Sequence, residues 1–257
     1  DVKNLKTEFI NDKKAFPIIK DVNFTLERGK VLGIVGESGC GKSVTVNTVL
    51  NLLPKNGRIA EGEITYFDED KPIELQKLKQ YGKEFRKLRG EKISMIFQDP
   101  MSALNPVYTI GNQITEVLFE HYDISKEEAN KRAIEMLEKL GIHNAAERMN
   151  DYPHQFSGGQ RQRIVIAIAM VCNPDILIAD EPTTALDVTI QAQILDLLDD
   201  LRKEHGTSII LITHDLGVIA QIADEVAVMY AGEIVEVGSV AQIFDEPKHP
   251  YTRSLLR

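Results

Sequence analysis

The sequence predicts an α/β fold in which a parallel sheet carries a helical insert. Short apolar strand candidates alternate with helix candidates at both ends of the chain, as in consecutive βαβ units. A glycine-rich loop joins the strand candidate at residues 30–35 to a helix candidate at residues 44–50. Between the two ends, roughly over residues 99–170, the apolar spacing becomes helical, which predicts an inserted helical subdomain.

The part of the chain before this insert is expected to be rich in strands. Its expected elements are strands at residues 23–26 and 30–35 around a turn at 27–29, a short strand pair at 59–67, a charged helix at 74–89 ended by Gly90, and a buried strand at 93–97. Each strand candidate is short and apolar and is bounded by turn-forming residues.

Helix and strand signals are also clear in the rest of the chain. Ser125 and Glu128 have the spacing of a capping box that opens a helix, and Gly141 ends that helix. After Pro174 the strand pattern returns. The expected elements are strands at residues 176–179, 208–213 and 226–229, a helix at 191–202, and a short final helix after Pro250.

Composition limits the classes of function. The 257 residues suffice for one large α/β domain or a core with a small subdomain. The net charge of −9 argues against broad nucleic-acid binding, which requires Lys and Arg to neutralise phosphates. No apolar run approaches the roughly 20 residues of a membrane-spanning helix. Cys40 and Cys172 form no disulfide framework, which favours a reducing, cytosolic setting.

The glycine-rich loop has the spacing G-x-x-x-x-G-K-S of a phosphate cradle. Glycines allow the tight turn, and successive N–H groups then point toward phosphate oxygens at a helix N-terminus. The lysine adds a positive charge, and the serine hydroxyl can bind Mg²⁺. The predicted nucleotide-binding residues are Gly36, Glu37, Ser38, Gly39, Cys40, Gly41, Lys42, Ser43 and Val44.

Two further groups of residues are typical of nucleotide chemistry. Asp180 and Glu181 end the apolar strand candidate at residues 176–179, where Asp180 could help hold Mg²⁺ and Glu181 could accept a proton from water. The alternative is an exposed acidic turn. Ser157, Gly158 and Gly159 open an apolar helix and could bind a second anion. A plain N-cap would explain the serine but not two consecutive glycines.

With these motifs in hand, the chain resembles the ATP-binding subunits of ABC transporters over nearly its whole length. The matching motifs, in order, are Walker A (Gly36 to Ser43), the Q-loop glutamine Gln98, the signature Phe156-Ser157-Gly158-Gly159-Gln160, Walker B with the catalytic glutamate (Asp180, Glu181), the D-loop Ala185-Leu186-Asp187 and the switch histidine His214. The signature has Phe156 where leucine is commoner in the family.

The resemblance implies a fold and a set of domain boundaries. The fold is a P-loop NTPase (RecA-like) core with an antiparallel β subdomain and an inserted ABC helical subdomain. The whole chain, residues 1–257, would be one ATP-binding domain. Its core would span about residues 1–98 and 171–245, its helical subdomain about 99–170, and the start of a C-terminal extension about 246–257.

The resemblance also implies roles for the motif residues. Lys42 and the loop amides would hold the ATP phosphates, while Ser43, Gln98 and Asp180 would serve Mg²⁺. Glu181 would polarise the attacking water and His214 would steady the γ-phosphate. Two such domains would meet head to tail. Residues Ser157, Gly158, Gly159, Gln160 and Asp187 would then act in trans on the partner's nucleotide.

A narrower resemblance is to the dipeptide and oligopeptide importers. It rests on residues 97–106, on residues 182–189 and on the tail His249-Pro250-Tyr251-Thr252. It implies ATP-driven peptide import at the cytoplasmic face of the membrane, with a second ATPase subunit (a copy or a paralogue), two integral permease subunits, an extracytoplasmic binding protein and no nucleic acid. The alternatives are a nickel or other small-solute importer of this branch, or a soluble ABC ATPase outside transport.

Three further expectations concern single residues and the chain ends. Phe16 is the nearest aromatic residue to the position where the family stacks adenine, although it could simply pack on the sheet. Cys40, among helix-start amides, predicts a lowered thiol pKa, unless it only fills a tight loop. The chain starts with Asp1 and stops within a helix candidate, so we expect a fragment. No iron–sulfur centre is expected within these 257 residues.

Overall fold

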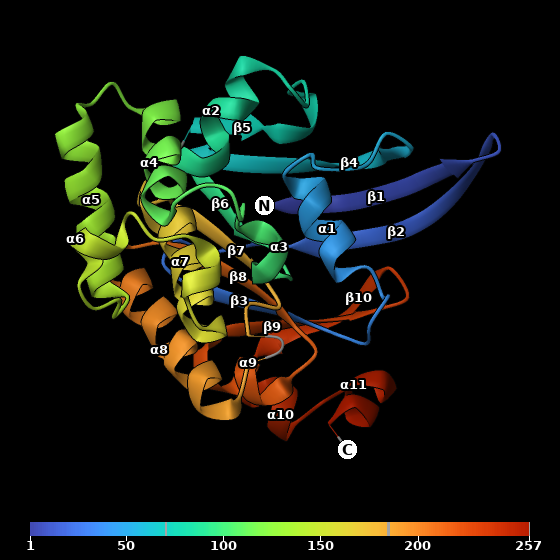
Figure 1. Ribbon diagram of the computed structural model, residues 1–257. Coiled ribbons are helices and arrows are strands. Elements are labelled where there is room, and N and C mark those ends of the chain that lie inside the picture. Colours follow the sequence, from blue (N-terminus) through green and yellow to red (C-terminus); the bar gives the residue numbers. More distant parts are fainter. Residues whose placement is uncertain (70, 184–185, 257) are drawn as a thin grey trace. The chain divides into compact units, whose positions relative to one another are not determined.

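A computed structural model describes residues 1–69, 71–183 and 186–256 (Figure 1). The chain divides into two compact units, Asp1–Arg86 with Ile209–Arg257, and Lys87–Ser208. The predicted helical insert, residues 99–170, belongs to the second unit. The helix α2 (Lys83–Glu91) runs from the first unit into the second along the chain.

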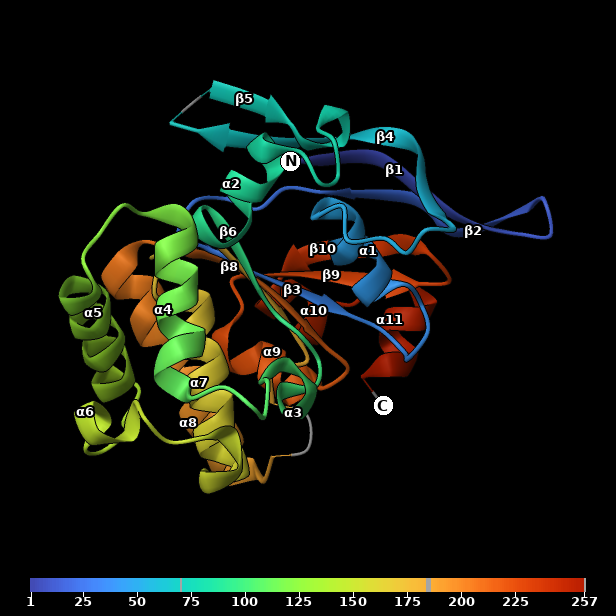
Figure 2. The same cartoon turned by 45° about the horizontal axis from the view of Figure 1, so that its top comes forward.

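The first unit is built on a mixed sheet with the strand order β5-β4-β1-β2-β10-β9-β3-β8. β3 is parallel to both β8 and β9, and all its residues are buried, as in a strand covered on both faces. β1, β2, β4 and β5 pair in antiparallel fashion. In both views β1 and β2 form a long twisted ribbon (Figure 1, Figure 2). The elements of this unit are β1 (Val2–Asn11), β2 (Lys14–Phe24), β3 (Val31–Val35), α1 (Lys42–Val49), β4 (Gly57–Asp68), β5 (Lys71–Glu74), the 3₁₀ turn η1 (Leu75–Lys77), β8 (Ser208–Thr213), α9 (Leu216–Ile222), β9 (Glu225–Tyr230), β10 (Glu233–Ser239), α10 (Val240–Asp245) and α11 (Pro250–Leu255).

The second unit combines a helical group with two parallel strands. β6 and β7 pair in register from Ile93 with Ile176 to Ile96 with Ala179. The helices α4, α5 and α7 pack against one another. Among the described residues, no helix is long and apolar enough to cross a membrane. The elements of this unit are β6 (Ile93–Ile96), α3 (Pro100–Ala103), α4 (Ile110–His121), α5 (Lys126–Lys139), α6 (Ala145–Arg148), the 3₁₀ turn η2 (Pro153–Gln155), α7 (Gly158–Met170), β7 (Ile176–Asp180) and α8 (Val188–His205).

The strand pair expected at residues 59–67 is wrong, because β4 is one continuous strand. Gly62, in the middle of this range, lies where β4 passes very close to β1. Its φ is 109°, and a Cβ there would lie 2.6 Å from the Cα of Leu5. The β1–β4 register shifts between Lys3 and Lys6. Glycine therefore marks an irregularity within the pair rather than a turn between strands.

The helix expected at residues 74–89 is wrong in its first half. Only Lys83–Glu91 is α-helical, and even that helix has non-helical dihedral angles at Arg89 and Gly90. Residues before it make contacts that compete with a helix, both with β4 and within their own segment. The Gln76 side chain accepts the N–H of Ile64, for example, and the N–H of Gly82 closes a turn onto the carbonyl of Lys79.

The helix start at Ser125 is confirmed, but the capping box is only half formed. The Ser125 hydroxyl accepts the N–H of Glu128, and Gly141 follows the helix with a φ of 75°. The Glu128 carboxylate, which a full box would direct back to Ser125, pairs with Arg132 instead. Strands β1 and β10 were not among the expected elements, and both lie beside β2 in the sheet.

Candidate functional site

The phosphate loop follows β3 and leads directly into α1, and two of its glycines are required by close contacts. A Cβ on Gly36 would lie 2.2 Å from the carbonyl oxygen of Met229. Gly41 caps α1 with a φ of 112°, and a Cβ there would lie 2.8 Å from the Ile19 side chain. The loop is therefore wrapped closely against β2 and β9, and glycine is the residue that allows this approach.

Lys42 is held inside this loop. Its side chain is 5% exposed, and its ammonium donates to the carbonyl oxygens of Gly36 at 2.7 Å and Glu37 at 3.0 Å. A buried ammonium requires such partners. Phosphate oxygens are charged and are therefore stronger acceptors than these carbonyls. Lys42 is thus positioned to exchange loop carbonyls for phosphate.

His214 lies at the same carboxyl-terminal end of the parallel strands as this loop. β3 and β8 are parallel, and Val35 lies opposite Thr213. Gly36 and His214 therefore directly follow the ends of two adjacent strands. His214 is exposed. The Asp215 side chain accepts the N–H groups of Gly217 and Val218 and thereby caps α9. The turn that carries His214 is consequently fixed on both sides.

Asp180, Glu181 and Gln98 come together in the second unit. β6 and β7 end side by side, and the Gln98 amide donates to the Glu181 carboxylate at 3.1 Å. Asp180 is 4% exposed at the end of β7. Glu181 has a φ of 48°, which is unusual for a residue other than glycine. Because φ is left-handed at Glu181, the extended conformation of β7 ends there.

The helix α7 is connected to this acidic pair by a residue that the sequence reasoning missed. Gln162 is fully buried, and its amide donates to the carbonyl of Pro182, directly after Glu181. The sequence signal is weak, because Gln162 lies between Arg161 and Arg163, before the apolar run that begins at Ile164. Its burial, which requires a polar partner, is evident only in the structure.

Ser157 caps α7, as the plainer alternative predicted. Its hydroxyl accepts the N–H of Gln160, and the Gln160 side chain accepts the N–H of Ser157, which completes a capping box. Phe156 before it is buried under the guanidinium of Arg148, 3.9 Å from the ring centroid. This cation–π contact is available to phenylalanine but not to the commoner leucine.

The two glycines after Ser157 differ in what they contact. A Cβ on Gly159 would lie 3.0 Å from the Ile190 side chain, so packing against α8 favours glycine there. A Cβ on Gly158 would meet nothing within 4 Å, and Gly158 is exposed. Nothing among the described residues of this chain thus explains Gly158. A side chain would therefore fit at this position of the isolated subunit.

The D-loop residue Asp187 is exposed and caps α8, where its carboxylate accepts the N–H of Ile190 at 2.9 Å. Ala185 of the same motif lies outside the described residues.

Phe16, the residue expected to stack on the adenine, lies on β2, opposite Phe9, and is 49% exposed. Ile19, three residues along the same strand, contacts the phosphate loop at Gly41. An exposed aromatic ring is chemically suited to stacking on a base.

The prediction of a lowered pKa for Cys40 is wrong. Burial raises the pKa of this thiol, and this effect outweighs the Lys42 ammonium and the loop amides, which lower it. Cys40 is 8% exposed, and its sulfur lies 2.8 Å from the position of a Cβ on Gly36. The thiol therefore acts as a small group that fills the inside of the loop.

We expect iodoacetamide to modify Cys40 roughly tenfold more slowly than free glutathione at pH 7.5, because a raised pKa leaves less thiolate. The rate should increase as the pH rises toward the raised pKa. Cys172, with a pKa raised to about 11, should react more slowly still. Mass spectrometry of timed samples measures both rates. Faster labelling of Cys40 than of glutathione would contradict this assignment.

Comparison with known proteins agrees with this geometry. Residues 19–184 match the family model described as ABC transporter. The chain is 56% identical over 257 residues to the oligopeptide transport ATP-binding protein OppD of Bacillus subtilis (strain 168), an alignment that covers 100% of this chain and 70% of OppD. It is 52% identical over 256 residues to the dipeptide transport ATP-binding protein DppD of the same strain, covering 99% and 75%.

Solved structures of ATP-binding cassettes share the fold. The dimeric post-hydrolysis state of the cassette MJ0796, bound to ADP and Pi, superposes with a TM-score of 0.79 at 31% identity, over 93% of this chain and 97% of that one. CbiO1 from Clostridium perfringens, part of the ABC transporter complex cbiONQ, gives 0.77 at 29% identity over 96% and 92%. The chain therefore belongs to the ABC transporter family, as one of its ATP-binding, ATP-hydrolysing subunits.

Proposed function

We propose that this chain powers the import of di- or oligopeptides across the cell membrane by ATP-driven pairing of two nucleotide-binding domains. The observation that carries the substrate class is the similarity, above 50% identity over nearly the full chain, to the oligopeptide protein OppD and the dipeptide protein DppD. The observation that supports ATP hydrolysis is the hydrogen bond between Glu181 and Gln98, which follow the ends of the adjacent strands β7 and β6.

Residues of the first unit bind the phosphates of ATP. Lys42 and the N–H groups of residues 39–44 hold the β- and γ-phosphates, and Phe16 stacks on the adenine. Ser38, Glu37 and Cys40 complete the loop. His214, at the neighbouring strand end, donates to the γ-phosphate and keeps the attacking water in line. These groups act mainly by position and charge, because phosphoryl transfer requires little covalent help from the protein.

The oxygen donors expected for Mg²⁺ suit that ion. The Ser43 hydroxyl makes no hydrogen bond within the described part of the chain, whereas the Thr45 and Thr48 hydroxyls bond to helix carbonyls. Mg²⁺ prefers such hydroxyl, amide and carboxylate oxygens. Ser43, Gln98 and Asp180 would hold the ion. When bound, it neutralises charge on the phosphates.

Hydrolysis falls to Glu181. Its carboxylate takes a proton from water as the water oxygen forms a bond to the γ-phosphorus. The bond from that phosphorus to the bridging oxygen breaks, and ADP keeps the electron pair. Gln98 holds the carboxylate from one side through its amide. A positioned general base of this kind contributes roughly 10²–10⁴-fold to the rate.

A second ATPase subunit, a copy or a paralogue, completes each site. Ser157, Gly158, Gly159 and Gln160 from the partner close the open side of the γ-phosphate and exclude water, which strengthens the electrostatic contacts within. Asp187 crosses to the partner and couples the two sites. The exposed start of α7 and the open space around Gly158 support this arrangement.

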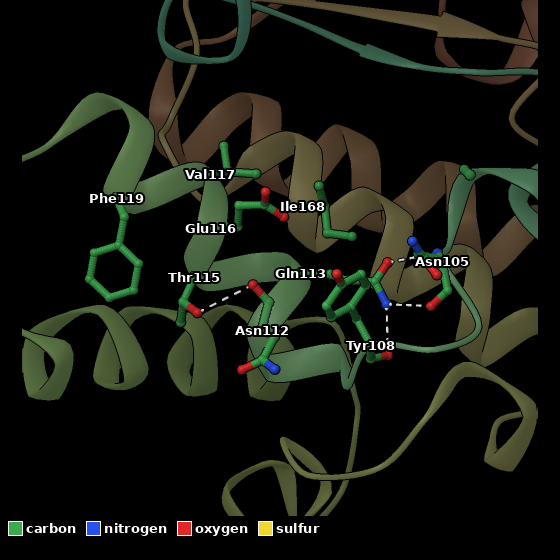
Figure 3. A pocket seen from close by; sticks show the side chains of 10 residues that line it. Asn105, Tyr108, Asn112, Gln113, Thr115, Glu116, Val117, Phe119 and Ile168 are labelled. Atoms are coloured by element: carbon green, nitrogen blue, oxygen red, sulfur yellow. Dashed lines mark hydrogen bonds between the residues drawn. The ribbon is translucent and has the colours of Figure 1, made fainter.

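A groove in the second unit is suited to the permease. It has a volume of about 740 Å³. Its wall, drawn in Figure 3, includes Tyr108, Asn112, Glu116 and Phe119 near or on α4, and Ile168 on α7. Tyr108 and Phe119 are 54% and 47% exposed. Exposed aromatic residues around a groove are typical of a surface that receives a helix.

One residue shapes this groove. The Gln113 amide donates to the carbonyl oxygens of Asn105 and Tyr108, both at 3.0 Å, and its oxygen accepts the N–H of Asn105 (Figure 3). The loop before α4 is therefore fastened to the helix. We assign the groove to a short cytoplasmic helix from one of two integral permease subunits, which holds this chain at the cytoplasmic face of the membrane. An extracytoplasmic binding protein delivers the peptide.

Replacement of Phe119 by serine tests this docking surface. The variant should fold and hydrolyse ATP normally, because the ring is half exposed, but should recover roughly tenfold less permease in affinity purification, as expected for loss of an interface anchor. The control is Phe67→Ser, which removes an equally exposed ring (46%) from β4. Equal recovery of permease by both variants would move the docking surface elsewhere.

Uptake assays in the native organism distinguish the substrate classes. Cells that lack this chain should lose uptake of labelled di- and oligopeptides, and the parent protein should restore it. Loss of nickel uptake with normal peptide uptake would favour the alternative importer of this branch. Normal uptake of both, with no permease bound to the purified protein, would favour a soluble ABC ATPase.

A further inference from the structure

A tyrosine far from the ATP motifs in sequence contacts the phosphate loop. The hydroxyl of Tyr251, on α11, accepts the N–H of Glu37 at 3.0 Å. On the other side of the same peptide group, the carbonyl of Gly36 accepts the Lys42 ammonium at 2.7 Å. We propose that Tyr251 is a positioning residue of the ATP site, which holds the Gly36–Glu37 peptide so that Lys42 is kept in place for phosphate.

Contacts with β9 and β10 hold Tyr251 in position. Its ring packs against that of Tyr230, at the end of β9, with 4.5 Å between the centroids and an angle of 42° between the ring planes. The segment before it is anchored to β10, because the Glu236 carboxylate accepts the N–H groups of Lys248 and His249 at 2.8 and 2.9 Å. His249 then caps α11 by accepting the N–H of Tyr251. The segment that carries the Tyr251 hydroxyl is therefore anchored to β10 where it contacts the loop.

The same β9–β10 hairpin holds the loop from a second direction. The N–H of Gly232, in the hairpin turn, donates to the carbonyl of Cys40 at 2.9 Å. The carbonyl of Met229 lies where a Cβ of Gly36 would be. Residues outside the Walker A motif thus hold the phosphate loop in place through these contacts. The Gly232 and Met229 contacts are made by backbone atoms, whereas the Tyr251 contact is made by a side-chain hydroxyl that a phenylalanine substitution removes.

The Tyr251 hydroxyl acts on ATP through Lys42. Peptide groups are planar, so a hydrogen bond at the Glu37 N–H restricts the direction of the Gly36 carbonyl, the acceptor for Lys42. Burial raises the pKa of Tyr251, so the phenol stays neutral at neutral pH and can accept this N–H. Without the hydroxyl, ATP would have to order the loop as it binds. That ordering reduces affinity.

The test is the variant Tyr251→Phe, which removes one oxygen and keeps the ring on Tyr230. We expect its Kd for ATP and ADP to rise about three- to tenfold, the usual effect of one lost hydrogen bond. The kcat at saturating ATP should stay within about twofold of the parent, because the catalytic groups are unchanged. Tyr81→Phe is the control, because Tyr81 is 80% exposed.

Titration of the folded protein with a fluorescent ATP analogue measures the Kd, steady-state phosphate release measures kcat and KM, and thermal unfolding without nucleotide measures the stability of the fold. A raised Kd and KM with an unchanged kcat supports the assignment. An unchanged Kd overturns it, whether or not the unfolding temperature falls, because the contact would then serve stability alone.

This inference rests on the proposed function of the loop, and the parent protein separates the two. If the parent does not bind ATP, the proposed function fails and the role of Tyr251 fails with it. If the parent binds ATP and Tyr251→Phe binds it equally well, only the role of Tyr251 fails. Tyr251→Ala, which also removes the ring, should weaken ATP binding at least as much as Tyr251→Phe, and a smaller effect would contradict the assignment.

Discussion

Glu181→Gln is expected to bind ATP as the parent does and to hydrolyse it roughly 10²–10⁴-fold more slowly, because an amide cannot accept the proton from water. The fold should survive the change. Glutamine has the same shape, and its amide oxygen can still accept the Gln98 N–H that now bonds to the carboxylate. ATP should therefore persist in the variant and hold two subunits together.

Phosphate release measures the rate, and light scattering with Mg²⁺ and ATP measures the association. Glu147→Gln is a matched control, because it makes the same chemical change at an exposed position on α6. It should leave both readouts unchanged. A Glu181→Gln variant that hydrolyses ATP within a few-fold of the parent would remove this carboxylate from the proton transfer.

Gly158→Asp is expected to abolish the ATP-driven dimer while leaving the isolated subunit as stable as the parent. A Cβ at this position contacts nothing among the described residues, and a carboxylate at the first position of α7 even favours the helix dipole. In the dimer the same carboxylate would face the partner's triphosphate. Two like charges about 4 Å apart repel by about 4 kcal/mol at an effective dielectric constant of 20, which corresponds to roughly a thousandfold weaker association.

The effect is measured most clearly in the Glu181→Gln background, where the dimer should otherwise persist. Lys126→Asp is the control, because Lys126 is also the first helical residue after a serine N-cap, at the start of α5. It should leave the dimer intact. If Gly158→Asp still dimerises with ATP, the start of α7 is not the surface that closes the partner's site.

The local motifs were the part of the site most readily predicted. The strand at residues 30–35, the loop and the helix after it were all identified, because glycine spacing and apolar runs act over a few residues. Prediction failed where glycines and polar residues serve contacts with distant strands. Gly62 lies against β1, and Gln76 pairs with Ile64, so both break the expected pattern for reasons outside their own segment.

The chemistry of Cys40 shows the same limit. Its neighbours along the chain, a lysine and helix-start amides, favour a lowered pKa. The fold buries the thiol, and desolvation reverses the direction. The degree of burial cannot be read from a loop sequence, because it depends on which strands cover the loop.

The sequence by itself determined that this protein binds and hydrolyses ATP as an ABC transporter subunit, because the motifs depend on residue types at short, fixed spacings. Only the tertiary structure decided which groups hold those motifs in place. The bonds from Glu37 to Tyr251 and from Gln98 to Glu181 join residues 214 and 83 positions apart. Contacts over such separations leave no periodic trace in the chain, since they are created when sheet and helices bring distant segments together.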